Sequence, residues 1–421
     1  MGQAMATEKS NIPALRFPEF KGVWELDSFG NKYVFIQTNS FSRALLNYDG
    51  GEVKNIHYGD IHTKFETNFD ITKEDVPYIN QEIDISKISK ESYCQVGDLV
   101  IADASEDYKD VGKAIEIRFL NKEKLLAGLH TYIARCRTQD ITHGFAGYMM
   151  QIHRVRLQIM EFATGISVLG ISKGNLGRVK VFLPTPNEQK KIADFLTAVD
   201  QKIAQLTEKK SCLEQYKKGV MQRLFTQRLR FLDISGNTFP NWEIKKASDV
   251  FENYSNKDHD GTLPILAATQ ENGVVRRDGI GIDIKSSAES ILSYKIVEVG
   301  NFVISLRSFQ GGIEYSNMRG ICSPAYTILR EKIKISHDFF KFYFKREDFI
   351  SRLSETVIGI RDGKQISYSA FAGMKLSFPS VPEQQKIADF LTAIDAKISA
   401  LGNQLTAAQD FKKSLLQKMF V

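Results

Sequence analysis

The sequence Glu188-Gln-Lys-Lys-Ile-Ala-Asp-Phe-Leu-Thr-Ala-Val-Asp-Gln-Lys-Ile203 decides the organisation of this chain, because it occurs twice. It returns as Glu383-Gln-Gln-Lys-Ile-Ala-Asp-Phe-Leu-Thr-Ala-Ile-Asp-Ala-Lys-Ile398, with 13 of 16 residues identical. Each copy follows a proline, Pro186 or Pro382, and proline is favoured in the first turn of a helix. A long internal repeat constrains the architecture of everything between its copies.

Apolar side chains recur at alternating steps of four and three residues along both copies, which is the heptad pattern of a coiled coil. They are Ile192, Leu196, Val199, Ile203, Leu206, Leu213, Val220 and Leu224 in the first copy, and Ile387, Leu391, Ile394, Ile398, Leu401, Leu405, Ala408, Leu415 and Met419 in the second. Each copy therefore predicts a helix of about 40 residues, roughly 60 Å long at 1.5 Å per residue.

Lysines interrupt the apolar seam and predict its register. Two helices joined by a domain can pack antiparallel, each starting where the other ends. That pairing places Lys412 beside Asp200 and, by the pseudo-twofold relation, Lys217 beside Asp395. We predict that these are two interhelical ion pairs, which determine the register of the two helices more than they add to the stability of the helix pair. The alternative is that these lysines extend out of the seam into solvent.

The repeat covers whole halves of the chain. The two tryptophans, Trp24 and Trp242, each stand at the start of a globular segment. We predict an α+β (mixed α/β) fold with a globular domain over 1–185, a central helix over 186–227, a second domain over 228–380 and a C-terminal helix over 381–421. Strands are expected at Tyr33–Ile36, Leu99–Ile101, Ala114–Ile117, Ile291–Leu292 and Phe302–Leu306, and single helices at Phe145–Gln158 and Phe339–Leu353. The two domains differ in sequence, which suggests two different ligands presented on one frame.

The amino-acid composition limits the classes of protein to which this chain can belong. The 421 residues are 43% hydrophobic and carry a net charge of +6, which permits a nucleic-acid partner without demonstrating one. No apolar run reaches 18 residues and no secretory signal occurs, so a cytoplasmic location is expected. The four cysteines include no CxxC, which argues against zinc and disulfides.

Catalytic signatures are missing from the sequence. The stretch 359–365 superficially resembles a phosphate loop, but it lacks the required spacing and the Ser or Thr after its lysine. No HExxH motif or histidine pair with metal-ligand spacing occurs. We therefore expect a binder without catalytic residues, metal or cofactor of its own.

Loops of both domains gather basic, aromatic and amide side chains. Such groups can bond base edges in the major groove or hold phosphates, although each one alone could also be an ordinary surface group. The predicted DNA-binding residues are Lys54, His57, Tyr58, His62, Thr63, Lys64, His130 and Arg135 in the first domain, and Arg276, Arg277, Arg307, Ser308, Gln310, Tyr315, Arg319, Arg361 and Lys364 in the second.

The doubled proline and Glu-Gln-x-x-Ile-Ala-x-Phe-Leu motif, at Pro186–Leu196 and Pro382–Leu391, resembles the specificity subunit of type I restriction-modification enzymes. The runs Phe302–Asn317 and Ser323–Tyr326 are also similar to members of that family. The resemblance implies two target recognition domains, each reading half of a bipartite double-stranded DNA site. It also implies helices that act as spacer and as platform for two modification (methyltransferase) subunits. Adenine methylation with S-adenosylmethionine, and translocation and cleavage with ATP and Mg²⁺ by restriction subunits, would belong to those partners.

Residues at the start of each helix are candidates for the contact with the modification subunits. They are Glu188, Gln189, Phe195, Glu383, Gln384 and Phe390. For the two phenylalanines, packing on the chain's own globular domain is an equal alternative. Two other classes of protein stay open: a protein–protein scaffold with two ligand-binding domains, and a nuclease or methylase that acts without partners.

Overall fold

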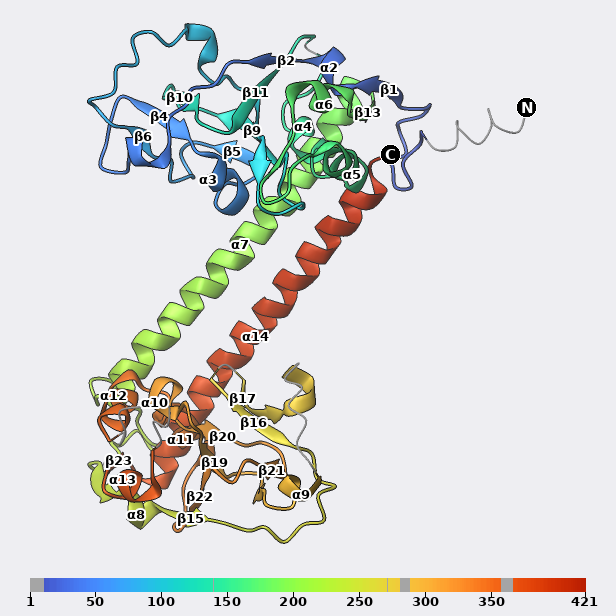
Figure 1. Cartoon of the computed structure of the whole chain (residues 1–421). Coiled ribbons are helices and arrows are strands. Elements are labelled where there is room, and N and C mark those ends of the chain that lie inside the picture. The colour runs from blue at the N-terminus through green and yellow to red at the C-terminus, as the bar shows by residue number, and fades with distance from the viewer. Residues whose placement is uncertain (1–10, 139, 271, 281–287, 357–365) are drawn as a thin grey trace. The chain divides into compact units, whose positions relative to one another are not determined.

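The computed structural model describes residues 11–138, 140–270, 272–280, 288–356 and 366–421. The chain folds as two compact units (Figure 1). Unit 1 consists of the residues up to Thr207 together with Asn403–Val421, and unit 2 is Glu208–Gly402. Each unit contains a globular domain and parts of both long helices, so each is described by itself. No helix in the described part of the chain is long and apolar enough to span a membrane.

Unit 1 is built on two mixed sheets. One has the strand order β2-β11-β7-β9-β5 and the other β10-β4-β6-β3. The first sheet contains β2 (Tyr33–Ile36), β11 (Thr131–Cys136), β7 (Leu99–Ala102), β9 (Ala114–Phe119) and β5 (Asn68–Asp70); the second contains β10 (Lys124–Ala127), β4 (Val53–Ile56), β6 (Tyr78–Ile79) and β3 (Leu46–Asn47). Two further pairs are β1 (Glu25–Ser28) with β13 (Lys180–Leu183), and β8 (Ala104–Ser105) with β12 (Leu169–Gly170).

Short helices connect these strands and cover the sheets. They are α2 (Phe29–Lys32), α3 (Tyr58–Thr63), α4 (Phe145–Met149), α5 (His153–Phe162) and α6 (Lys173–Arg178), with 3-10 turns at Arg43–Leu45 and Lys90–Ser92. Strand β7 is buried along its whole length, as expected of an apolar run in the middle of a sheet. The single helix expected over Phe145–Gln158 is instead α4 and α5, because Ile152 takes an extended backbone conformation between them.

Unit 2 has smaller sheets. A four-stranded sheet has the order β15-β22-β19-β20, and three strand pairs accompany it. The four strands are β15 (Phe251–Tyr254), β22 (Thr327–Glu331), β19 (Phe302–Ile304) and β20 (Glu314–Tyr315); the pairs are β14 (Glu243–Lys246) with β23 (Lys375–Phe378), β16 (Leu266–Thr269) with β17 (Gly273–Arg276), and β18 (Lys295–Val297) with β21 (Gly320–Cys322).

The helices of unit 2 correct two sequence-based expectations. They are α8 (Ala247–Val250), α9 (Ala288–Ile291), α10 (Ser308–Gly311), α11 (His337–Tyr343), α12 (Glu347–Glu355) and α13 (Tyr368–Ala372), with a 3-10 turn at Arg277–Ile280. The strand expected at Ile291–Leu292 is wrong, because Ile291 ends α9. The helix expected over Phe339–Leu353 is broken at Lys345, whose Nζ donates to the carbonyl of Gly311 (2.9 Å) and to Glu314 (2.5 Å).

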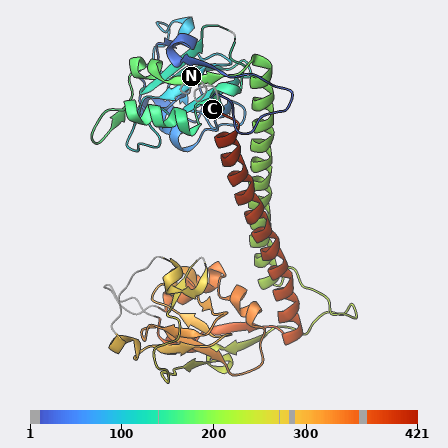
Figure 2. The same ribbon diagram turned by 90° about the vertical axis from the view of Figure 1, so that its right-hand side faces the viewer.

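The two long helices are α7 (Pro186–Phe225) and α14 (Val381–Lys418). They pack antiparallel within each unit, where both views show them side by side (Figures 1 and 2). In unit 1 the core joins the start of α7, at Ile192 and Leu196, to the end of α14, at Leu415. In unit 2 the end of α7, at Leu224, joins the start of α14, at Ile387. The heptad positions therefore face inward as predicted.

Both predicted lysine–aspartate pairs are present. Lys412 Nζ lies 2.7 Å from Asp200 in unit 1, and Lys217 Nζ lies 2.5 Å from Asp395 in unit 2. The Tyr148 hydroxyl also donates to Asp200 (2.8 Å), and Lys412 lies over the Tyr148 ring. The lysines are thus held by the partner helix and do not extend into solvent.

These ion pairs should fix register while stabilising the units only slightly. Both partners of each pair are partly exposed, so we expect a coupling free energy of about 0.2–1 kcal/mol between Lys217 and Asp395. A double-mutant cycle with alanine at both positions, followed by urea unfolding of the whole chain, measures it. The matched cycle is Lys412 with Asp200. Couplings above about 2 kcal/mol would contradict this assignment, because they would indicate buried pairs.

Candidate nucleic-acid interface

An aromatic and imidazole cluster forms the candidate interface of unit 1. Four of the predicted residues meet around the ring of Tyr58, at the start of α3. The ring of His57 is 4.6 Å from it, that of His130 is 5.5 Å away and that of His62 is 6.0 Å away, measured between centroids. His130 comes from the turn between β10 and β11. The loop at the start of α3 and the turn before β11 are distant in sequence but lie side by side at this cluster. Residues of both are predicted to contact DNA.

Cations surround this cluster. Lys64 donates to the Tyr48 hydroxyl (3.0 Å), and Arg43 donates to Asp60 (2.7 Å) and to His57 Nδ1 (3.2 Å). Burial lowers the pKa of His57, and the charge of Arg43 lowers it further. His57 is therefore held neutral among positively charged neighbours. A surface of cations interleaved with aromatic rings suits nucleic acid, because phosphates pair with the cations and bases contact the rings.

Several predicted residues of unit 1 have internal roles instead. Lys54 pairs with Glu123 (2.8 Å) and lies over the Tyr78 ring. The Thr63 hydroxyl donates to the carbonyl of Gly59 (2.9 Å) within α3. Lys54 is thus held within the second sheet, which corrects the expectation for that side chain. Thr63 is exposed on α3, and its contact with DNA stays a prediction.

His62 is a further predicted side chain of unit 1 that has an internal contact. Its Nε2 lies 3.1 Å from the carbonyl oxygen of Ala104, and its Nδ1 is a buried atom without a partner among the described residues. The ring contributes to the packing of Tyr58 but offers no polar atom at the surface.

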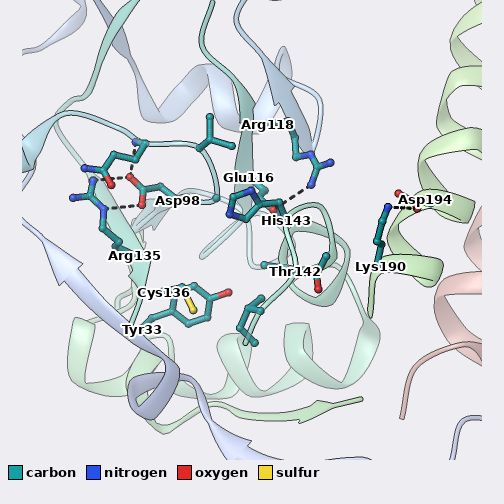
Figure 3. Close-up of a pocket in the computed structure, with 15 residues that line it drawn as sticks. Tyr33, Asp98, Glu116, Arg118, Arg135, Cys136, Thr142, His143, Lys190 and Asp194 are labelled. Carbon is teal, nitrogen blue, oxygen red and sulfur yellow. Dashed lines mark hydrogen bonds and ion pairs between the residues drawn. The ribbon is translucent and has the colours of Figure 1, made fainter. Parts of the chain in front are cut away.

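Arg135 belongs to a polar cavity of about 780 Å³ in unit 1 (Figure 3). Its Nε and Nη2 donate to the two carboxylate oxygens of Asp98 (2.9 and 2.8 Å). Its Nη1 and Nη2 also donate to the carbonyls of Glu91 and Tyr93. Each of its three nitrogens is thus used to hold the loop before β7. Arg135 is therefore a structural residue, contrary to the prediction.

The rest of this cavity is equally committed to the fold. Glu116 accepts hydrogen bonds from the backbone N–H groups of Gly144 and Gly147 (2.7 Å for the latter) and lies 3.7 Å from Arg118. Burial raises the pKa of Glu116, which these hydrogen bonds partly offset. On α7, Lys190 pairs with Asp194 at the cavity edge (Figure 3). Among the described residues no three His, Cys, Asp or Glu side chains gather in a way that could hold a metal ion.

The candidate interface of unit 2 centres on Tyr326. Burial raises the pKa of Tyr326, and the charges of Arg277 and Arg307 partly oppose that rise. Arg277 stacks on Tyr294, with 5.7 Å from its guanidinium carbon to the ring centroid. Lys295 donates to the Tyr326 carbonyl (2.7 Å). Cationic side chains and tyrosines thus meet here, in a chemistry unlike the imidazole cluster of unit 1.

The other predicted residues of unit 2 are scattered. Arg276 pairs with Asp278 (2.8 Å) and Arg319 with Glu298 (3.2 Å), and Gln310 is exposed beside Gln270. Within the described part of the chain, none of these three side chains contacts Tyr326 or Tyr294.

Ser308 is a correction in unit 2. It is buried and its hydroxyl accepts a hydrogen bond from the backbone N–H of Ser305 (2.9 Å), so it supports the fold. Tyr315 is half-buried against Phe302, with 5.5 Å between ring centroids, and its contact with DNA stays a prediction. Arg361 and Lys364 lie outside the described residues.

Sequence reasoning missed several members of the two clusters. They are Arg43, Asp103, Tyr132 and Lys173 in unit 1, and Tyr294, Lys295 and Tyr326 in unit 2. Two of them had a signal, since Tyr132 lies two residues after the predicted His130 and Tyr326 ends the run Ser323–Tyr326 that resembles the type I family. Arg43, Asp103 and Lys173 lie farther along the chain from the residues they contact.

The residues predicted to contact modification subunits are mostly buried. Glu188, Gln189, Glu383 and Gln384 are each at most 1% exposed. Glu188 accepts from Arg16 (2.7 Å), and Glu383 accepts from Arg230 (2.9 Å). These four side chains anchor each helix to its own globular domain, so the expectation that they contact a partner is corrected.

The repeated glutamines and phenylalanines make matching internal contacts. Gln189 donates to the Pro184 carbonyl and Gln384 to that of Pro379, both at 2.9 Å. The phenylalanines pack edge to face on their own domains, with ring centroids 5.8 Å apart for Phe17–Phe195 and 5.4 Å apart for Phe231–Phe390. Of the two alternatives, packing on the globular domain is the one observed.

The family model for the type I restriction modification DNA specificity domain matches this chain twice, over residues 48–215 and 240–408. The chain belongs to this family. It is a type I restriction-modification specificity subunit with two target recognition domains, one in each unit. The sequence-based assignment of the family and of the internal duplication is confirmed.

Two relatives of this specificity subunit come from Methanocaldococcus jannaschii. The subunit named MjaX is 23% identical over 371 residues, covering 85% of this chain and 84% of the relative. The type I restriction enzyme MjaVIII specificity subunit is 25% identical over 324 residues, covering 71% and 74%.

Solved structures share the fold. The crystal structure of a type I restriction-modification S subunit from M. genitalium has a TM-score of 0.57 at 13% identity, covering 97% of this chain and 99% of that one. A second structure, from a study of complex assembly in the type I system, has a TM-score of 0.52 at 13% identity, covering 93% and 96%. At this identity the likeness shows the fold alone, and it confirms the predicted fold class.

Proposed function

We propose that each target recognition domain reads one half of an asymmetric, gapped DNA site. The observation that supports this most is the chemical difference between the two candidate interfaces. Unit 1 presents imidazoles around Tyr58, whereas unit 2 presents Arg277 stacked on Tyr294 and Lys295 bound to the carbonyl of Tyr326. Because the helix repeat is nearly identical while these surfaces differ, the two half-sites should be unlike.

The long helices suit the role of spacer in this proposal. A helix of 40 residues is about 60 Å long at 1.5 Å per residue. One turn of DNA is roughly 34 Å, so such a helix is long enough to separate half-sites by a turn or somewhat more. The base pairs between the half-sites would be spanned without being read.

The chemistry would belong to the partners of this subunit. Modification subunits would methylate adenine with S-adenosylmethionine, and restriction subunits would use ATP and Mg²⁺. The contribution of this chain is selection of the site. Phosphate contacts would supply most of its affinity for DNA, so binding should weaken steeply as salt rises.

Exposed residues of the helix repeat are the proposed docking surface for two modification subunits. Asp194, Ala198 and Lys202 are exposed on α7, and the same residue types are exposed at Asp389, Ala393 and Lys397 on α14. Core packing does not explain identity at exposed positions. The matching surfaces on α7 and α14 suggest that each binds one copy of the same modification subunit.

Native mass spectrometry of the chain with its modification subunit tests this stoichiometry. We expect two partners per wild-type chain, and one when Asp194 and Lys202 are both charge-reversed. The matched reversal of Asp389 and Lys397 should also leave one. One or four partners on the wild-type chain, or two on both variants, would contradict the proposal. Affinity for DNA that does not change with salt would point instead to a protein–protein scaffold.

A further inference from the structure

The imidazole of His130 is held outward by an unusual backbone conformation. Its φ is +57°, in the left-handed region that residues other than glycine seldom adopt, and its side chain is 49% exposed. The Asp103 backbone N–H donates to the His130 carbonyl (3.1 Å), which helps to hold this turn. An uncommon conformation retained at an exposed position suggests that the side chain has a function.

A carboxylate determines which nitrogen of this ring carries the proton. His130 Nδ1 lies 3.2 Å from Asp103 Oδ1. An ionised carboxylate only accepts hydrogen bonds, so Nδ1 must be the donor. In the neutral ring Nε2 is then an acceptor, and it has no partner among the described residues.

Asp103 is itself fixed by a tyrosine of β11. Burial, together with the charge of Asp103 and a hydrogen bond to it, raises the pKa of Tyr132 to about 12. Tyr132 therefore stays protonated beside this carboxylate. Lys173 lies over the Tyr132 ring, 5.2 Å from its centroid. The orientation of His130 is set by this chain of contacts.

The neighbouring imidazole has the opposite hydrogen-bonding character. His57 Nδ1 accepts from the backbone N–H of Gly59 (3.1 Å) and from Arg43 (3.2 Å). The neutral ring of His57 must therefore carry its proton on Nε2, as a donor. The cluster around Tyr58 thus combines an acceptor on His130 with a donor on His57.

An acceptor in the major groove can bond only one kind of group. The exposed base atoms there are acceptors, apart from the thymine methyl and the exocyclic amino groups of adenine N6 and cytosine N4. We infer that His130 is a base-reading residue, whose Nε2 accepts a hydrogen bond from the exocyclic amino group of an adenine or cytosine. This inference rests on the proposed function and names the group that unit 1 reads.

The first test is the methylome of cells carrying this chain with its modification subunit. His130→Gly removes the imidazole and suits the left-handed backbone, so the fold should be retained. We expect one position in a single half-site to lose its base preference, while the other half-site stays unchanged. The wild-type base at that position, an A·T or a G·C pair, distinguishes adenine from cytosine.

The second test measures the hydrogen bond with DNA that lacks the amino group. Purine replaces the adenine, or 2-pyrimidinone the cytosine, at that position in a binding duplex. We expect the wild-type complex to bind the altered duplex about tenfold or more weakly, and the His130→Gly complex to bind both duplexes equally. Lys64→Met is the matched control, expected to weaken both duplexes alike and to keep the motif.

The outcomes separate the two claims. Wild-type cells without any gapped methylated motif would overturn the proposed function itself. A gapped motif that His130→Gly leaves unchanged would overturn only the inference. An equal loss of DNA affinity in the His130→Gly and wild-type complexes, when the amino group is removed from the base, would also overturn only the inference.

Discussion

Replacing Arg16 with methionine should lower the free energy of unfolding of unit 1 by about 3–5 kcal/mol. Arg16 donates to both carboxylate oxygens of Glu188, at 2.7 and 2.8 Å, and Glu188 is 1% exposed. Without Arg16, the remaining hydrogen bond to this buried carboxylate from the described residues is the 3.3 Å one from Trp24 Nε1. A buried charge that loses its partner destabilises far more than a broken surface pair.

The two tryptophans make this change measurable in one unit. Trp24 lies in the core of unit 1 and Trp242 packs against that of unit 2, so Trp242→Phe leaves a fluorescence probe for unit 1 alone. Urea unfolding followed by Trp24 fluorescence should show the loss. The control is Lys190→Met, which breaks the exposed pair with Asp194 on the same helix and should cost about 0.5 kcal/mol or less. A loss below about 1 kcal/mol for Arg16→Met would contradict the assignment.

The second large effect is expected at the far end of the chain. Phe420→Ala should destabilise unit 1 by about 3–5 kcal/mol. Phe420 is 5% exposed, with its ring centroid 6.0 Å from that of Trp24 and 5.5 Å from that of Phe145. Removing this ring leaves a cavity between the end of α14 and the N-terminal domain.

Hydrogen exchange followed by mass spectrometry locates that effect. Protection should fall in β1, β13 and α4 of unit 1 while the strands of unit 2 keep theirs. Phe411→Ala is the matched control, since Phe411 is 52% exposed on α14, nine residues earlier, and its loss should change stability by about 0.5 kcal/mol or less. Equal loss of protection in both units would contradict the claim that Phe420 completes the core of unit 1.

The duplication explains why these contacts come in pairs. Arg230 binds Glu383 in unit 2 as Arg16 binds Glu188 in unit 1. Phe225, at the end of α7, packs on Phe339 with ring centroids 5.4 Å apart. Each globular core is thus completed by a helix end from the other half of the sequence. Sequence identity between the two repeats is greatest at the start of the long helices, where each helix is anchored to its globular domain.

The antiparallel pair of long helices was predictable from sequence, because it depends on the heptad periodicity of apolar residues. Leu196 and Leu391 are fully buried at heptad positions, and the register that those positions impose also predicts the pair of Lys412 with Asp200. The helix break at Lys345 was not predictable, because it depends on contacts with Gly311 and Glu314 about 30 residues earlier in the chain.

The candidate DNA contacts were predictable only in part. Loop composition singled out Tyr58 and His130, and the structure places their rings together, 5.5 Å apart between centroids. It could not reveal that Arg135 binds Asp98, since a side chain bound within its own domain looks the same in sequence as a free one. For the same reason Glu188, whose repetition suggested a partner, is an internal anchor.

Methylome sequencing most directly tests the claim that this chain selects an asymmetric, bipartite DNA site. Cells would express it with its modification subunit, either as wild type or with alanine at both Arg277 and Arg307. We expect N6-methyladenine at one gapped, asymmetric motif, and loss of preference in only one of its halves in the variant. No sequence-specific methylation, from a complex that forms and whose modification subunit is active with another specificity subunit, would contradict the account.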